Sequence, residues 1–232
     1  REERELVKQH VAVVRHRTAE INRAKALLLK HGVRLPYTDF TSERALTFAE
    51  RAAPENLSFI VGQSASHIRF LNNQLKTIDA CIADRAQQNA DAVLLKTIPG
   101  IGWFSALLIA AQIDGIERFP SDQQLASYCS LTPSINQSGS DAAKIGRMSK
   151  QGNPLLRWVL IQDSWQAVAR STYFKKLFRK KKRKRNAQIA VVAVARKLVK
   201  VIFGVLTRRC AFSESALVGR VRCDALAKLE GI

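Results

Sequence analysis

A serine stands at the head of a polar and basic segment that leads into an apolar stretch near residue 160. Ser138 precedes Gly139, and the cations that follow are Lys144, Arg147, Lys150 and Arg157. A serine hydroxyl is a weak nucleophile, so it needs a base or an electrophile whose charge has been neutralised. Lysine and arginine suit the second role, because they stabilise a phosphoryl transition state and position DNA. The pattern suggests a serine that attacks a phosphate, although a Ser-Gly pair in a loop is also ordinary turn chemistry.

Histidine, the usual base for a serine nucleophile, occurs only earlier in the chain. The four histidines are His10, His16, His31 and His67. A local Ser-His-Asp triad is therefore not expected. The same distribution argues against a tyrosine recombinase built on Tyr128 or Tyr173, and against a nickase with paired histidines. The acids nearest the serine segment, Asp114, Asp141 and Asp163, have no spacing that predicts a metal site.

The charge balance predicts a polyanionic partner. The chain has 232 residues, with 38 Lys and Arg against 19 Asp and Glu and a formal net charge of +19. Such an excess favours nucleic acid through counterion release, with an anionic membrane surface as the alternative. A hydrophobic content of 47% allows a real core. No apolar stretch approaches the roughly 20 residues that a membrane span needs.

The chain begins at Arg1, without a methionine or an apolar signal region, so we expect a C-terminal fragment of a longer polypeptide. Its cysteines are Cys81, Cys129, Cys210 and Cys223. They form no C-x-x-C pair, which indicates reduced thiols in the cytoplasm and neither a zinc site nor a disulfide framework.

The elements expected to position the serine are helices. Residues 1–93 are predicted to be a helical linker, because apolar residues repeat at three-four spacing in two stretches, interrupted at Ala53-Pro54. The first stretch has Val7, Val11, Val14, Thr18, Ile21 and Leu28, and the second has Ile68, Leu71, Leu75, Ile78 and Ile82. These helices either pair with each other as an antiparallel pair or join two copies of the chain, since the period alone does not name the partner.

A compact domain is predicted over residues 94–209. Its opening Ile98-Pro99-Gly100-Ile101-Gly102 resembles a helix-hairpin-helix, in which Gly100 and Gly102 allow the backbone to approach a DNA phosphate at a helix N-terminus. The alternative is an ordinary αα-hairpin turn. Ser121 and Asn153 are predicted to be helix N-caps. The segment between residues 136 and 152 is predicted to be an exposed loop. We expect Trp158 to pack inward with Leu156, Val159 and Leu160.

A dense basic block follows between Lys175 and Arg185, where nine of eleven residues are Lys or Arg. We interpret it as a solvated arm or loop that binds phosphates. Tyr173, Phe174 and Phe178 at its edge are expected to anchor the arm to the core, with stacking on bases as the alternative. The predicted DNA or RNA contacts in the arm are Lys180, Lys181, Lys182, Arg183, Lys184 and Arg185. The alternative is a solubilising loop. Asn186 is expected to cap a buried core helix, and residues 210–232 to form a tail. Since no period-two pattern persists, the predicted fold class is all-α.

The order of several short motifs resembles one family. The motifs are Ile-Pro-Gly-Ile-Gly at 98–102, Arg118-Phe119, Leu131-Thr132-Pro133, Gln137-Ser138-Gly139, Lys144-Ile145-Gly146-Arg147, Lys150-Gln151-Gly152-Asn153 and Leu156-Arg157. From about Leu95 to Arg209 the chain resembles the C-terminal transposase domain of the IS110 family of bacterial insertion-sequence transposases, related to the Piv DNA invertase. The preceding helices look like that family's linker.

The resemblance implies a DNA recombinase guided by a structured bridge RNA. It implies that Ser138 is the nucleophile and forms a transient phosphoserine link to a DNA end. Metal-binding carboxylates and Mg²⁺ would belong to an N-terminal RNase-H-like domain outside this chain. DNA, guide RNA and a second copy of the chain are the expected partners, in the bacterial cytoplasm at the nucleoid. The alternatives are a non-catalytic helix-hairpin-helix DNA-binding module and an RNA-binding structural protein, neither of which needs Ser138.

Overall fold

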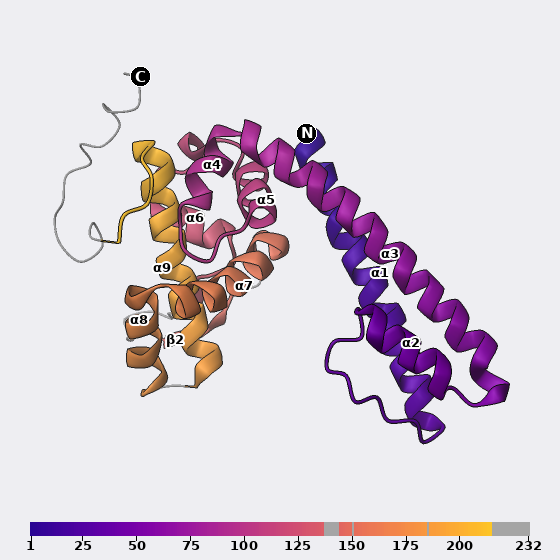
Figure 1. Ribbon diagram of the computed structural model, residues 1–232. Helices are drawn as coiled ribbons and strands as arrows, with labels where there is room; N and C mark the ends of the chain where they lie inside the picture. Colours follow the sequence, from indigo (N-terminus) through magenta and orange to yellow (C-terminus); the bar gives the residue numbers. More distant parts are fainter. Residues whose placement is uncertain (137–143, 150, 185, 215–232) are drawn as a thin grey trace. The chain divides into compact units, whose positions relative to one another are not determined.

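The computed structural model describes residues 1–136, 144–149, 151–184 and 186–214 (Figure 1). The chain divides into two compact units, Arg1–Asp84 and Arg85–Ile232. This division lies at a different place from the predicted one after residue 93, which falls inside the helix α4 (Ala90–Lys96). The described residues are mainly helical, which confirms the all-α class.

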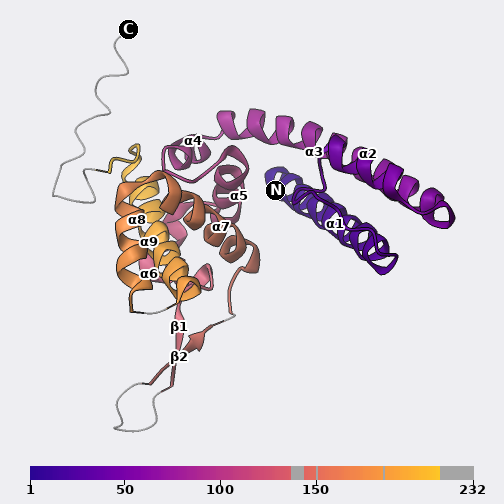
Figure 2. The same cartoon turned by 60° about the horizontal axis from the view of Figure 1, so that its bottom comes forward.

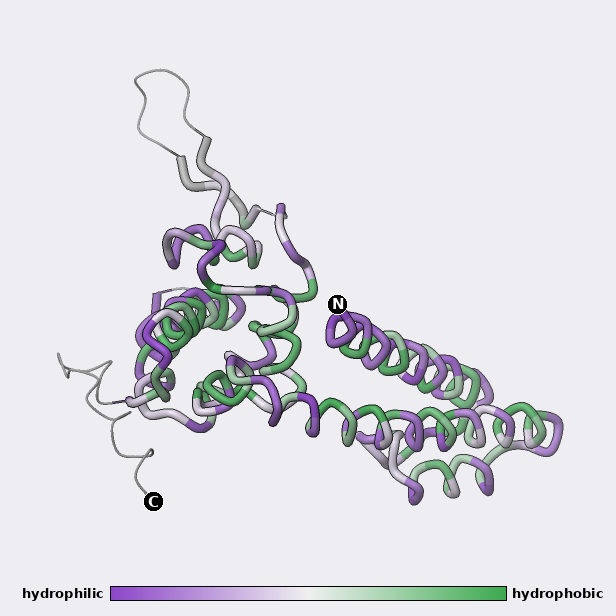
Figure 3. The backbone as a smooth tube through the Cα atoms, turned by 90° about the horizontal axis from the view of Figure 1, so that it is seen from above, coloured by the Kyte–Doolittle hydropathy of each residue, from purple (hydrophilic) through white to green (hydrophobic). Residues whose placement is uncertain are grey.

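The first unit contains α1 (Glu2–Lys30), α2 (Glu43–Ala52) and most of α3 (Glu55–Gln88). Helices α1 and α3 run antiparallel. Near the start of α1, His10 Nε2 lies 3.0 Å from Asp79 Oδ1, and further along α1 Arg17 donates to the Asn72 side chain at 2.9 Å. The helices turn their hydrophobic sides toward each other (Figure 3). The predicted antiparallel pair is therefore confirmed.

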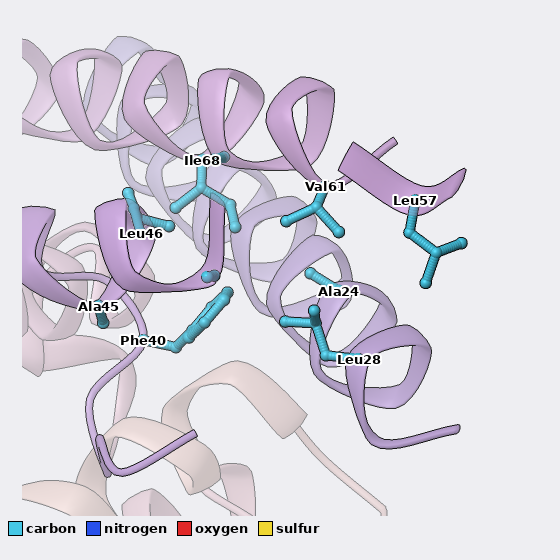
Figure 4. Close-up of a cluster of buried hydrophobic side chains, with 10 residues drawn as sticks. Ala24, Leu28, Phe40, Ala45, Leu46, Leu57, Val61 and Ile68 are labelled. Carbon is cyan, nitrogen blue, oxygen red and sulfur yellow. The ribbon is translucent and has the colours of Figure 1, made fainter. Parts of the chain in front are cut away.

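The core of this unit is formed by α2 and the loop before it as well as by the predicted pair of helices, α1 and α3. Phe40 and the α2 residues Leu46 and Ala49 are buried against α1 and α3 (Figure 4). The helix partners in this cluster are Ala24, Leu28, Leu57, Val61, Ala65 and Ile68. Because α2 and its loop widen the buried face beyond a two-helix seam, Ala24 is buried while the predicted seam residue Thr18 is exposed.

The second unit is built around α9 (Ala187–Arg208). This helix packs against α4, α6 (Asp122–Tyr128), α7 (Pro154–Arg170), α8 (Thr172–Lys182) and the 3₁₀ turn Ile116–Arg118. Its buried residues are Ala190, Val191, Val194, Ala195, Leu198, Val199, Val201, Ile202, Val205 and Leu206. They surround most of the helix, so the predicted core helix is confirmed. The helix continues through Gly204.

The helix starts follow the predicted caps. The side chains of Ser121, Asn153 and Asn186 each accept a hydrogen bond from a backbone N–H in the first turn of α6, α7 and α9. Each cap satisfies a donor that the helix itself leaves free.

The predicted loop between residues 136 and 152 is partly wrong. Two short strands, β1 (Pro133–Asn136) and β2 (Lys144–Met148), form an antiparallel ladder in which Ile135 pairs with Ile145. The ladder extends from the helical unit (Figure 2). Strands of four and five residues are too short to produce a clear period-two pattern.

The prediction of a solvated arm after Lys175 is also wrong, because α8 continues through Lys182. Phe174, Leu177 and Phe178 recur at helical spacing within the basic block. Phe174 is fully buried, and the other two are half-buried. These three apolar side chains anchor a helix whose exposed surface is mainly cationic. Phe174 anchors the basic block to the core, as predicted.

In the part of the chain that the structure describes, no helix is both long and apolar enough to cross a membrane. Among the described residues, Cys81, Cys129 and Cys210 are not joined in a disulfide.

Candidate nucleic-acid interface

Ser138 lies outside the described residues, but the strands on either side of its segment are described. β1 ends at Asn136, and the Cα of Asn136 pairs with the Cα of Lys144 at the start of β2. Lys144 is therefore held at the end of the ladder from which residues 137–143 leave. Arg147 lies further along the same strand, while Lys150 falls outside the described residues.

The base of the ladder is tied to the helical unit by hydrogen bonds. The Ser149 N–H donates to the Thr132 carbonyl at 2.9 Å, and the Ser130 hydroxyl donates to the Gln151 carbonyl at 2.8 Å. The Asn153 N–H donates to the carbonyl of Tyr128, in α6, at 2.7 Å. These bonds fix where both strands enter and leave the unit.

Gly152 makes this attachment possible. Its φ is +115°, and a Cβ built at this position would lie 2.5 Å from the Tyr128 carbonyl oxygen and 2.7 Å from the Ser130 hydroxyl. Any other residue would push the chain away from α6 and strain the backbone. The glycine is therefore required by the contact between the ladder and α6.

Arg157 lies one turn into α7, where it is half-buried. The start of this helix is held by Asn153, whose side-chain amide donates to Gln112 Oε1 at 2.7 Å. Gln112 belongs to α5 (Trp103–Ile113), so α5, α6 and α7 meet where the ladder joins the unit. Lys144 and Arg157 are thus carried by elements that share one attachment point.

The two glycines of the α4–α5 turn differ in their surroundings. Gly100 has a φ of +98°, and a Cβ there would lie 2.5 Å from the backbone nitrogen of Ala167 in α7. Its close approach is therefore to α7, within the protein. Gly102 is the N-cap of α5, and a Cβ built on it would meet no atom within 4 Å. The rest of the chain therefore does not crowd the backbone at Gly102, at the N-terminus of α5. The predicted DNA contacts of both glycines stay predictions.

Cations line an open hollow of about 840 Å³ along α8. The described residues around it are Lys176, Arg179, Lys180, Lys182 and Arg183. Lys181 and Lys184 are exposed on the same segment, and Arg185 is outside the described residues. Three of the predicted nucleic-acid contacts, Lys180, Lys182 and Arg183, therefore lie at one surface. Lys176 and Arg179, which the sequence analysis did not name as contacts, lie at the same surface. Such a concentration of positive charge favours a phosphate backbone.

The carboxyl group of Asp163 is buried in α7 and was assigned no role from the sequence. Its Oδ1 accepts a hydrogen bond from the Ser105 hydroxyl at 2.7 Å, and its Oδ2 has no partner. Burial raises the pKa of Asp163 to about 7, and the bond from Ser105 opposes that rise.

Trp158 was expected to pack inward, but 43% of it is exposed. Leu156, Val159 and Leu160 are buried as predicted. The exposed ring contacts Phe104, and a second α7 tryptophan, Trp165, is 41% exposed. Trp158 therefore lies at the edge of the buried face of α7, where its ring contacts Phe104 of α5 and stays partly open.

Residues 92–179 match the sequence model of the transposase family IS116/IS110/IS902. Over these residues the chain carries the transposase domain of that family. The matched residues include the α4–α5 turn, the strand ladder, α7 and most of α8, so the transposase family shares the parts that carry the predicted site.

Three relatives illustrate the match. The transposase for insertion sequence element IS1111A of Coxiella burnetii is 30% identical over 218 residues, covering 88% of this chain and 58% of that protein. The transposase for IS1328 of Yersinia enterocolitica is 25% identical, covering 88% of this chain and 62% of that protein. The pilin gene-inverting protein of Moraxella bovis is 27% identical, covering 71% and 53%. The chain therefore spans little more than half the length of these relatives.

Proposed function

We propose that this chain takes part in DNA strand exchange as the serine-bearing portion of an insertion-sequence transposase. The observation that carries the proposal is that the family match over residues 92–179 includes the strand ladder on both sides of Ser138. The cationic surface of α8 supplies a place for the DNA backbone. A DNA substrate implies work at the bacterial nucleoid in the cytoplasm.

In the proposed step, Ser138 Oγ forms a bond to a DNA phosphorus while the serine proton is removed. The bond from phosphorus to one deoxyribose oxygen breaks, and that oxygen leaves as a hydroxyl after it takes up a proton. The DNA end stays esterified to the serine until a second deoxyribose hydroxyl displaces it. Lys144, Arg147, Lys150 and Arg157 would stabilise the charge on the phosphoryl oxygens.

Mg²⁺ and a guide RNA belong to the same proposal, as partners of the longer protein. Bound Mg²⁺ would neutralise charge on the phosphate. Within the described residues, however, no group of three or more His, Cys, Asp or Glu side chains is placed to hold an ion. These residues do not fit a metal site, and we derive no step through the ion. The cations of α8 suit the backbone of a guide RNA as well as that of DNA.

The decisive experiment compares Ser138→Ala with wild type in the transposase that contains this chain, together with guide RNA, Mg²⁺ and DNA. We expect a covalent protein–DNA band on a denaturing gel for wild type and none for the variant, with DNA binding retained. Ser140→Ala, two residues further along the same segment, is the matched control and should keep the band.

Equal recombination by wild type and Ser138→Ala would show that Ser138 is a turn residue. Tight DNA binding without a covalent band or recombination in any of the three proteins would favour the alternative, a non-catalytic DNA-binding module. That alternative has its own support in the open surroundings of Gly102 at the start of α5.

A further inference from the structure

The outward face of α7 carries a stripe of exposed, uncharged side chains. Its members are Trp158, Gln162, Trp165 and Ala169, at spacings of four, three and four residues. The tryptophans are 43% and 41% exposed. Tryptophan is usually highly buried, so two partly open rings on one helix face need a physical reason.

Both rings are held by an aromatic neighbour from another helix. The Trp158 and Phe104 ring centroids lie 6.5 Å apart at an interplanar angle of 73°, and those of Trp165 and Phe178 lie 5.4 Å apart at 61°. Edge-on contacts of this kind fix ring orientation without covering both ring faces. Seven residues of helix separate the tryptophans by about 10 Å along α7. The stripe therefore offers two ordered aromatic surfaces.

The stripe connects two features that suit phosphate. Phe104 lies in the first turn of α5, two residues after the open N-cap Gly102. Phe178 lies in α8, where Lys175 and Lys182 are one turn before and after it on the same helix face. Helix α7 packs against both α5 and α8 (Figure 1). Each aromatic pair thus lies within about one helical turn, along the chain, of a cationic or anion-accepting group.

Charge identifies the kind of partner. All residues of α7 and α8 are described, and Asp163, which is buried, is the one acidic side chain among them. Apart from small residues such as Ala169 and Thr172, the exposed side chains of these two helices are mainly aromatic, amide or cationic, and a protein partner with mixed charges would gain little from them. A nucleic acid matches all three, since unpaired bases stack on aromatic rings, amides bond to base edges and cations contact phosphates.

We propose that Trp158 and Trp165 form a stacking surface for unpaired bases of single-stranded DNA. This proposal rests on the proposed function, because strand exchange separates DNA strands and leaves bases without partners near the cleaved end. Paired bases inside a duplex have no free face, so duplex DNA would gain only the phosphate contacts. Gln162, exposed between the two rings, is placed to bond to a base edge.

The test uses the 232-residue chain and two labelled oligonucleotides of about 20 nucleotides, longer than a typical single-strand site. One is oligothymidine, and the other is an abasic strand with the same phosphates. Wild type is expected to bind oligothymidine more tightly. Trp165→Ala and Trp158→Ala should each weaken oligothymidine binding at least about fivefold, as loss of one stacked base predicts, while abasic binding is unchanged.

Two further variants separate stacking from hydrophobic contact and from folding. Trp165→Phe keeps an aromatic ring and should retain most of the preference, whereas Trp165→Leu keeps apolar packing against Phe178 and should lose it. Tyr37→Leu removes a half-buried aromatic ring from the first unit and serves as the matched control. Circular dichroism checks that each variant is folded.

Equal binding of both oligonucleotides by wild type would overturn this proposal while leaving the proposed function intact. Full preference in Trp165→Leu, or equal losses on both strands in the alanine variants, would also overturn it. Tighter binding of oligouridine than of oligothymidine would replace DNA with RNA as the partner. No binding to any strand would count against the proposed function as well.

Discussion

At the scale of single residues, the buried carboxyl group of Asp163 makes stability depend on pH. Burial raises its pKa to about 7 from an ordinary value of 3.8. Between these two pH values the folded state holds a proton that the unfolded chain has lost. The contribution of Asp163 to the free energy of unfolding is therefore fully present below about pH 4 and is lost as the pH rises toward 7, by a few kcal/mol on the order-of-magnitude relation between pKa and energy.

We expect Asp163→Asn to remove this pH dependence, because the amide resembles the protonated carboxyl and cannot ionise. The thermal midpoint of the variant minus that of wild type should increase between pH 5 and pH 8. Ser105→Ala is the informative control, since it removes the hydroxyl that opposes the raised pKa and should extend the decrease in stability to higher pH. The same midpoint difference at both pH values would contradict the assignment.

At the scale of elements, α8 combines an anchoring face with a cationic one. Phe174 is buried, while the cations around the hollow point away from the core. Their phosphate contacts should add little sequence preference, because lysine and arginine on phosphates position a protein without reading bases. Affinity should instead depend steeply on salt.

Replacing Lys180, Lys182 and Arg183 together by glutamine should weaken DNA binding and reduce the slope of log affinity against log salt by about 2 to 3. Fluorescence anisotropy at several salt concentrations measures both quantities. The matched control replaces the exposed cations Lys30, Arg44 and Arg51 of the first unit, with the same change in net charge. Equal effects of the two triple variants would mean that overall charge, and not α8, determines binding.

At the scale of the whole molecule, a net charge of +19 makes two copies of the chain repel each other. Two copies are therefore expected to meet through a surface that carries no charged side chains. The outward face of α3 provides such a place. Phe59 and Phe70 are 76% and 57% exposed there. The exposed stripe at helical spacing is Phe59, Gln63, Ser66, Phe70, Asn73 and Thr77. The pattern and exposure of this stripe support the prediction that the chain forms a homo-oligomer through its N-terminal helices.

Changing Phe59 and Phe70 together to serine should reduce the mass measured by light scattering from that of an oligomer to that of one chain. Leu29→Ser, which alters an exposed apolar residue of α1, should leave the mass unchanged. A wild-type mass of one chain at micromolar concentration would reject oligomer formation through this face.

The sequence by itself determined features that depend on local chemistry. Apolar spacing identified α3 and α9, and cap residues such as Asn153 located helix starts, because both signals arise from neighbours in the chain. The order of motifs identified the family, which the match over residues 92–179 confirms. Net charge predicted a polyanionic partner, which stays a prediction for the experiments above.

The tertiary structure decided which groups meet. Gly100 and Gly152 are required by contacts with α7 and α6, distant in sequence. Asp163 is buried where the hydroxyl of Ser105, in α5, donates a hydrogen bond to it. The exposure of Trp158 and the folding of the basic block as α8 also depend on neighbouring helices. Local spacing describes one element at a time, whereas burial and close approach are properties of surfaces that come together only when the chain folds.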